Sequence, residues 1–480
     1  MAIREEQDDK IINAGGYVGN SSGKIKIINC GYGTNVSDLE RYEGKSEYDK
    51  YQDGEILSSA GGSSHITNIG CMQNYGCMIG FKDSGECEIT NCVGNEYNYT
   101  EGSSIEYVGG AIGKITSSAQ ITKFRNLSVF SLDSYVGGVI GIISNAPNVN
   151  ITDCENARYK IKDSEAIIKG TYVGGIVGYC EKSNLYINNC SNRMQIEGLE
   201  AVGGIVGSAF EIYGGSIKNC YNTTNLKSNS YRGGIIGQLS NLDIINCYNH
   251  GNIEGDNAPA GGIFGSTSGS ENNIIQYCYN RGNIKNDNNP VGGISGSLGQ
   301  KKVNDCFNDG NIESNIAPAG GISGIGAFEI SDSVNYGSIS STGPLGGIVG
   351  SSGRGTLTRC YNRADVKGGL PVGGIIGVGN NGTVTTNVIA CENSGYISSE
   401  DTSGNSILYI REIMGTGSVD SSCKYLISSN NAIGGGATGV ENEELLTTCD
   451  LNWFVSKVNS LIDSSLKTWK IDDNRCSTIF

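Results

Sequence analysis

The sequence predicts an all-β chain folded as a parallel β-helix, or β-solenoid, with about 28–30 residues per coil and a small C-terminal α/β cap. A glycine word, typified by residues 172–178 (YVGGIVG), recurs ten times at gaps of 26 to 37 residues. Each repeat holds short apolar segments between polar turns and shows no helical period, as expected for stacked β coils. The first glycines of the word are Gly109, Gly137, Gly174, Gly203, Gly233, Gly261, Gly292, Gly320, Gly346 and Gly373.

Composition narrows the possible functions. The chain has 480 residues, 73 of them glycine, and a formal net charge of −15. This charge argues against a basic face that binds nucleic acid or anionic lipid. No apolar run approaches the roughly 20 residues that span a bilayer, so we expect no membrane insertion. Residues 1–7 lack the apolar core of a signal peptide, and residues 11–19 already resemble a repeat, so we expect that a signal has been removed.

Residues 1–104 are predicted to form irregular coils. Their period is lost over residues 31–64, which we interpret as an insertion that loops out of the solenoid, the usual place for a specific function. Tyr42, Tyr48 and Tyr51 stand there among charged residues and are candidate ligand-binding side chains. The alternative is an ordinary solvated loop.

Residues 105–400 are the regular array, and each of its units begins with the glycine word. One position of the word carries only small or branched apolar residues, so we expect it to face the core as part of a short strand. The following position takes Val177, Phe264, Ser295 and Ser323, and this mixture predicts that it faces solvent or a loose edge. The expected core residues are Ala111, Val139, Ile176, Ile205, Ile235, Ile263, Ile294, Ile322, Ile348 and Ile375.

The rest of each unit contains an apolar residue, a cysteine three places later and a second apolar residue six places after the cysteine. The spacing of three breaks strand alternation, so we place a bulge or corner before the cysteine. Prolines two residues before the first glycine mark the entrance of the next strand, because proline cannot donate to a ladder. They are Pro259, Pro290, Pro318, Pro344 and Pro371.

Residues 401–439 are expected to form last coils in which the repeat pattern is degenerate, and residues 440–480 are expected to form a cap. Leu451, Phe454, Val455, Val458, Leu461 and Ile462 follow helical spacing after Asp450. The pattern of residues 466–471 then predicts a strand. A cap is needed because an open coil end exposes unpaired backbone and apolar core.

Residues 175–178 (GIVG) resemble the GLUG word of repeat-bearing bacterial surface and secreted proteins, among them adhesins and the non-catalytic parts of some peptidases. The resemblance covers roughly residues 105–400, although isoleucine or valine replaces the family's leucine. It implies a β-helical repeat array at the cell surface or outside the cell. It transfers no catalytic residue to this chain.

The repeated cysteines are predicted to form a buried apolar column, with disulfides between coils as the alternative. Their spacing is the coil period, there is no C-x-x-C pair, and the chain has 2 histidines, so we expect no metal site and no cofactor. The column comprises Cys30, Cys92, Cys154, Cys190, Cys220, Cys247, Cys278, Cys306, Cys360 and Cys391, with Ser333 in one unit.

An asparagine two residues after each cysteine predicts a hydrogen-bonded amide ladder from coil to coil. The position between cysteine and asparagine should point outward, and aromatic residues there suggest a surface stripe that binds a glycan. The alternative is a stack of rings that stiffens the sheet. The stripe residues are Tyr221, Tyr248, Tyr279, Phe307 and Tyr361.

No zinc-protease motif or phosphate loop occurs, and the acidic residues scatter over turns. The leading hypothesis is therefore a non-catalytic secreted or surface-displayed repeat protein, a stalk or adhesin, that binds a glycan or a host or cell-surface protein. The first alternative is a β-helix polysaccharide-degrading enzyme, a lyase or glycosidase. The second is a structural protein that self-associates.

Overall fold

The computed structural model describes residues 106–131, 134–156, 167–267, 272–369, 371–379 and 386–399, residues 23–28, 78–94 and 269, and short pieces elsewhere. Contacts divide the chain into two compact units. Unit 1 comprises Met1–Ser228 and Ile236–Leu242, and unit 2 comprises Asn229–Ile235 and Asp243–Phe480. The chain is all-β, and its parallel sheets form a β-solenoid, which confirms the predicted fold class.

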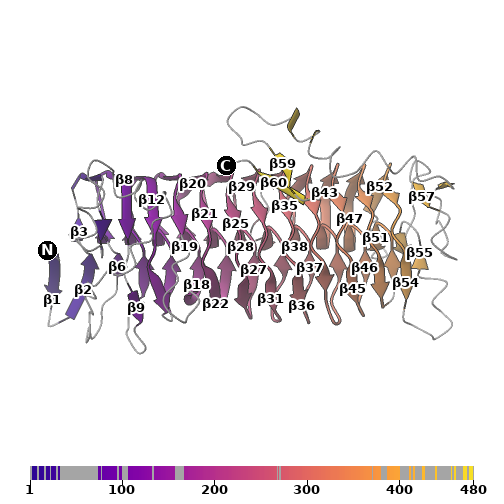
Figure 1. The fold of residues 1–480 in the computed structure, drawn as a ribbon, viewed down its shortest axis with the longest axis horizontal. Helices are drawn as coiled ribbons and strands as arrows, with labels where there is room; N and C mark the ends of the chain where they lie inside the picture. Colours follow the sequence, from indigo (N-terminus) through magenta and orange to yellow (C-terminus); the bar gives the residue numbers. More distant parts are fainter. Residues whose placement is uncertain are drawn as a thin grey trace. The chain divides into compact units, whose positions relative to one another are not determined.

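One coil of unit 2 shows the common plan (Figure 1). Its strands are β32 (Ala260–Gly261), β33 (Phe264–Thr267), β34 (Ile274–Gln276), β35 (Tyr279–Asn280) and β36 (Ile284–Asn286). Each strand pairs in parallel with its equivalent in the next coil, and β32 pairs with β37 (Val291–Gly292). Residues at equivalent positions of the repeat therefore stack into columns along each unit.

Unit 1 follows the same plan. Its coils pair through β10 (Tyr107–Gly109), β14 (Tyr135–Gly137) and β18 (Ile167–Gly174), and through β11 (Ile112–Ile115), β15 (Ile140–Ser144) and β19 (Val177–Glu181). The strands of neighbouring coils lie side by side in Figure 1. Tyr107, Tyr135 and Tyr172 are direct register partners.

The glycine word is a sharp turn between two strands, which corrects the prediction of one continuous strand. Strand β32 ends at Gly261, and β33 begins at Phe264. A Cβ atom at Gly261 would collide with the carbonyl oxygen of Phe264, and one at Gly262 with the side chain of Asn280. Only glycine lets the backbone turn this tightly against the neighbouring chain.

This turn directs two consecutive side chains into the core. Ile263 has no exposed surface, as predicted, but Val177, Phe264, Ser295 and Ser323 have none either. The prediction that the latter position faces solvent is therefore wrong. It assumed strand alternation through the word, and the turn breaks that alternation.

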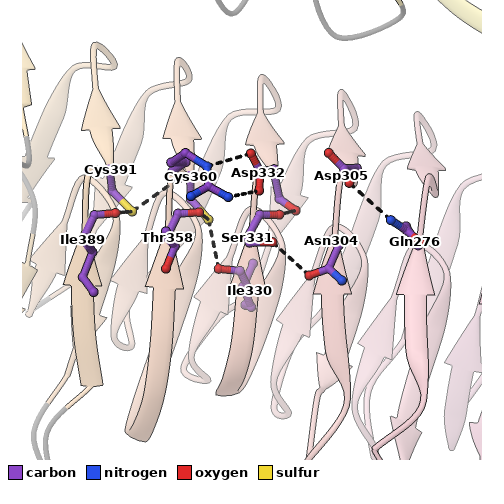
Figure 2. Close-up of polar contacts among 12 residues, drawn as sticks. Gln276, Asn304, Asp305, Ile330, Ser331, Asp332, Thr358, Cys360, Ile389 and Cys391 are labelled. Atoms are coloured by element: carbon purple, nitrogen blue, oxygen red, sulfur yellow. Dashed lines mark hydrogen bonds and ion pairs between the residues drawn. The ribbon is translucent and has the colours of Figure 1, made fainter. Parts of the chain in front are cut away.

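The corner before each cysteine is confirmed. The residue there has a left-handed backbone, with φ between 50° and 55° at Asn246, Tyr277, Asp305, Asp332, Arg359 and Ala390. At this corner Gln276 donates to Asp305 at 3.4 Å, and just before it Ser331 donates to Asn304 at 2.9 Å (Figure 2). The corner therefore separates a polar outer row from the buried thiols.

The cysteine and asparagine columns are both buried. The described column cysteines are free thiols, and the backbone N–H of Cys154 lies 3.4 Å from Cys190 Sγ. Cys30 lies outside the residues whose side chains are described. The asparagine ladder is confirmed, for each Nδ2 donates to the next Oδ1 at 2.6 to 2.9 Å. In unit 1 it joins Asn126, Asn156, Asn192 and Asn222, and in unit 2 Asn249, Asn280, Asn308, Asn335, Asn362 and Asn393.

The N-terminal part contains further strands. β1 (Ile3–Gln7) pairs antiparallel with β2 (Lys10–Gly15), and β2 pairs in parallel with β6 (Asn74–Gly76). β5 (Gly31–Tyr32) pairs with β8 (Cys87–Gly94), so the first two residues of the predicted insertion belong to the ladder.

At the C-terminus, β59 (Trp469–Asp472) and β60 (Arg475–Thr478) form an antiparallel pair, and β59 overlaps the predicted strand. Asp450 and the apolar residues of the predicted cap helix lie outside the described residues.

Candidate functional site

The aromatic column predicted as a surface stripe is largely buried. The exposed fractions of Tyr248, Tyr279 and Phe307 are 5%, 1% and 2%, and Tyr221 reaches 9%. Tyr361 is half-buried. A sugar-binding strip requires accessible ring faces, which this column does not offer. The prediction of an outward, solvent-exposed stripe is therefore wrong.

Contacts between rings explain part of this burial. The centroids of Tyr279 and Phe307 lie 5.4 Å apart, and Phe307 stacks on Tyr336 at 5.3 Å. His250 lies 4.8 Å from Tyr248 and meets Tyr279 edge-on at 6.0 Å. Coils about 4.8 Å apart bring bulky outward rings close enough to cover one another. These contacts agree with the ring-stacking alternative.

The other predicted site was the insertion. Tyr42, Tyr48 and Tyr51 lie outside the described residues, so their role stays a prediction.

A second aromatic group, on the outside of unit 1, is more accessible. We name it the Tyr cluster. Its side chains are all half-buried and come from β7 (Ile79–Lys82), β10, β14, β18 and β19. Its members are Phe81, Tyr107, Tyr135, Tyr172 and Tyr179.

The glycine word brings these rings together. Tyr172 precedes the turn and Tyr179 follows it, and the tight turn leaves their rings 5.1 Å apart at an interplanar angle of 69°. The neighbouring coil adds Tyr135, which stacks on Tyr172 at 5.0 Å and 6° and meets Tyr179 at 5.3 Å. Tyr107 continues the row 5.4 Å from Tyr135. Four tyrosines from three coils thus form one aromatic surface.

The cluster ends at a change in side-chain size. In the next coil, Ala201 is the register partner of Tyr172, and Ser208 is that of Tyr179. The two large rings are therefore replaced in the next coil by two small side chains, both of them fully buried. Ser208 donates to Gln238 Oε1 at 3.2 Å.

Charges flank the rings on both sides. Lys114 Nζ lies 4.9 Å from the ring centre of Tyr107 and 5.7 Å from that of Phe81, within the range of a cation–π contact. Ser144 Oγ donates to Glu181 Oε1 at 2.7 Å, next to the rings. Burial, reinforced by the charge of Glu106, raises the pKa of Tyr107 to about 12. The phenol is therefore neutral at physiological pH and can donate and accept hydrogen bonds.

The sequence contains a signal for this cluster. Tyr107, Tyr135 and Tyr172 stand two residues before the first glycine of the word, the same place that proline takes in later coils. A register comparison of this position along the whole array identifies three of the five rings. Phe81 and Tyr179 follow the turn, and only the folded arrangement connects them to the others.

Among the described residues, no group of three or more His, Cys, Asp or Glu side chains could hold a metal ion. Glu155 is instead bound on both sides by arginines, with Arg125 Nη2 at 2.9 Å from Oε2 and Arg193 Nε at 2.9 Å from Oε1. Both carboxylate oxygens of Glu155 are therefore taken up by ion pairs within the protein.

Comparison with family models, curated proteins and solved structures gave no match. In the part of the chain that the structure describes, no helix is long and apolar enough to cross a membrane.

Proposed function

We propose that the chain is a non-catalytic repeat protein, secreted or displayed at a cell surface, that binds a glycan through the Tyr cluster. The observation that carries the proposal is the gathering of Tyr107, Tyr135, Tyr172 and Tyr179 on one outer surface. Aromatic rings offer sugars an apolar face, and phenol hydroxyls offer hydrogen bonds at the ring edge.

The surroundings of the cluster support a sugar over a nucleic acid or an anionic membrane. Glu106 and Glu181 bring negative charge to the rings, and the chain carries a net charge of −15. Both would repel a polyanion. The resemblance of the glycine word to GLUG repeats supports a location at or beyond the cell surface.

A glycan array with the full chain tests this proposal. We expect Tyr172→Ala to weaken binding to the bound glycans by about fivefold, since one lost stacking contact is worth on the order of 1 kcal/mol. Tyr186→Ala is the matched control, because Tyr186 is 42% exposed on β20 (Asn184–Asn188), outside the cluster. Equal binding by wild type and both variants would place recognition elsewhere, with the insertion at residues 31–64 as the next segment to delete.

The enzymatic alternative predicts sugar release. Incubation of the chain with each bound glycan, followed by chromatography of the products, should give no fragments. Fragments that persist in a repurified sample would favour a polysaccharide-degrading enzyme instead. Self-association as the main role predicts assemblies that grow with concentration in light scattering and are unaffected by the Tyr172 substitution.

A further inference from the structure

A buried lysine in unit 2 contacts a side-chain amide of the preceding coil. Lys301 has no exposed surface, although lysine is almost never fully buried unless it is paired. Its Nζ lies 2.9 Å from Asn273 Oδ1. The two residues are opposite each other in the ladder, because the next pair along, Ile274 and Lys302, is in register between β34 and β39 (Lys302–Asn304). The amine is thus held against the carboxamide of an adjacent coil.

A carboxylate lies on the other side of the same amide. Asn273 Nδ2 donates to Asp243 Oδ1 at 3.3 Å, and the backbone N–H of Ile274 donates to the same oxygen at 3.0 Å. The second bond fixes the carboxylate beside the amide nitrogen. Lysine and aspartate from the two flanking coils therefore contact the oxygen and the nitrogen of one carboxamide, that of Asn273.

We propose that Lys301 and Asn273 form an intramolecular isopeptide bond, with Asp243 as the catalytic proton carrier. The Lys301 side chain, as the neutral amine, attacks Cγ of Asn273 and forms the Nζ–Cγ bond. The Asp243 carboxylate takes a proton from the attacking nitrogen and passes it to Nδ2. The Cγ–Nδ2 bond then breaks and ammonia leaves, which restores the carboxylate and requires no oxidant or cofactor.

The surroundings favour each part of this step. Attack requires the neutral amine, and burial away from water disfavours an ammonium ion. Once Nζ is bonded to Cγ, both nitrogens sit on the same carbon, so a carboxylate that reaches Nδ2 also reaches Nζ. Holding amine and carbonyl at hydrogen-bond distance replaces a collision in solution with an intramolecular reaction.

The product would staple two coils covalently. The described cysteines are all free, so no disulfide among them performs this task. A solenoid is otherwise held together by contacts between neighbouring coils and can open at any of them. The isopeptide bond would block opening between β34 and β39. This inference is independent of the glycan proposal.

Intact mass spectrometry of the denatured full chain tests it. Wild type should be lighter than its sequence mass by one ammonia molecule, and a protease digest should contain a branched peptide that joins Asn273 to Lys301. Lys301→Arg keeps a long nitrogen-bearing side chain but has no attacking amine, so it should have the full mass. Lys302→Ala is the matched control. Lys302 is partly exposed and paired with Glu329 at 2.6 Å, so this variant should still lose ammonia.

Asp243→Asn should slow or abolish the mass loss, because it removes the proton carrier. The mass spectrum of the wild-type chain tests the proposal by itself, even if a variant fails to fold. A full-mass wild type, both fresh and after prolonged incubation, would overturn the proposal. So would an equal loss of ammonia in Lys301→Arg, since that result assigns the loss to cyclisation of some other asparagine.

Discussion

Replacing Asn280 with alanine probes the amide ladder at an interior position of unit 2. Asn280 is fully buried. It accepts a hydrogen bond from Asn249 Nδ2 at 2.9 Å, and donates to Asn308 Oδ1 at 2.8 Å and to the carbonyl of Gly282 at 2.9 Å. Alanine removes all three bonds and leaves buried partners that water cannot easily reach.

The expected cost follows from these bonds. Each buried hydrogen bond contributes about 1 kcal/mol, so three give about 3 kcal/mol. Part of the loss is softened locally, because Asn249 Nδ2 also donates to the carbonyl of Gly251 at 2.8 Å, and Asn308 Oδ1 also accepts from the N–H of Gly310 at 3.3 Å. We therefore expect the free energy of unfolding to fall by about 2 kcal/mol.

Chemical denaturation followed by circular dichroism measures this change. The control is Asn283→Ala, three residues later in the same coil. Asn283 is exposed, and its Oδ1 accepts from the backbone N–H of Asn311 at 3.0 Å. Water replaces such a bond, so the control should lose only about 0.5 kcal/mol. Equal losses in the two variants would refute the claim that the buried ladder stabilises the coils.

Three further predictions concern burial. Ile263→Asp and Ser295→Asp should both unfold neighbouring coils, because both positions are buried and an unpaired buried charge costs several kcal/mol. Thermal melting measures this loss, and a Ser295→Asp variant that melts like wild type would contradict it. Cys154 and Cys190 should resist thiol reagents until the chain unfolds, since burial raises the pKa of both thiols, and labelling of the native chain would contradict this. Tyr107 should ionise near pH 12. The difference in tyrosinate absorbance between wild type and Tyr107→Phe measures this ionisation. Because the unperturbed pKa of tyrosine is 10.0, the contribution of Tyr107 to stability falls as the pH rises from 10 to 12.

Periodicity alone predicts much of the fold. The coil length, the corner before the cysteine, and the buried cysteine and asparagine columns all follow from side chains that recur in register. Each column accepts only a narrow range of residue types. Ser333, which takes the place of a cysteine, shows that a small polar side chain is within that range. There the backbone N–H of Cys306 donates to Ser333 Oγ at 3.2 Å, so a small polar atom fills the same place.

The predictions fail at positions where the alternation of side chains along a strand does not determine whether a residue faces the core or the solvent. The turn at Gly261 and Gly262 sends both Ile263 and Phe264 inward, although they are neighbours in sequence. Burial of Tyr279 depends on rings of other coils, which a single repeat does not contain. The Tyr cluster, likewise, needs Tyr179 to fold back beside Tyr172, and that depends on the three-dimensional shape of the turn.

The most direct test of the account compares Tyr135→Ala with Tyr279→Ala in two measurements on the same samples, glycan binding and thermal melting. Tyr135 belongs to the half-buried Tyr cluster, whereas Tyr279 is 1% exposed in the ring column. We predict that Tyr135→Ala loses glycan binding and melts close to wild type. Tyr279→Ala should bind normally and melt at a lower temperature, because a buried aromatic side chain contributes about 3 kcal/mol or more to stability. The opposite pattern, in which Tyr279→Ala loses binding and Tyr135→Ala retains it, would contradict the account.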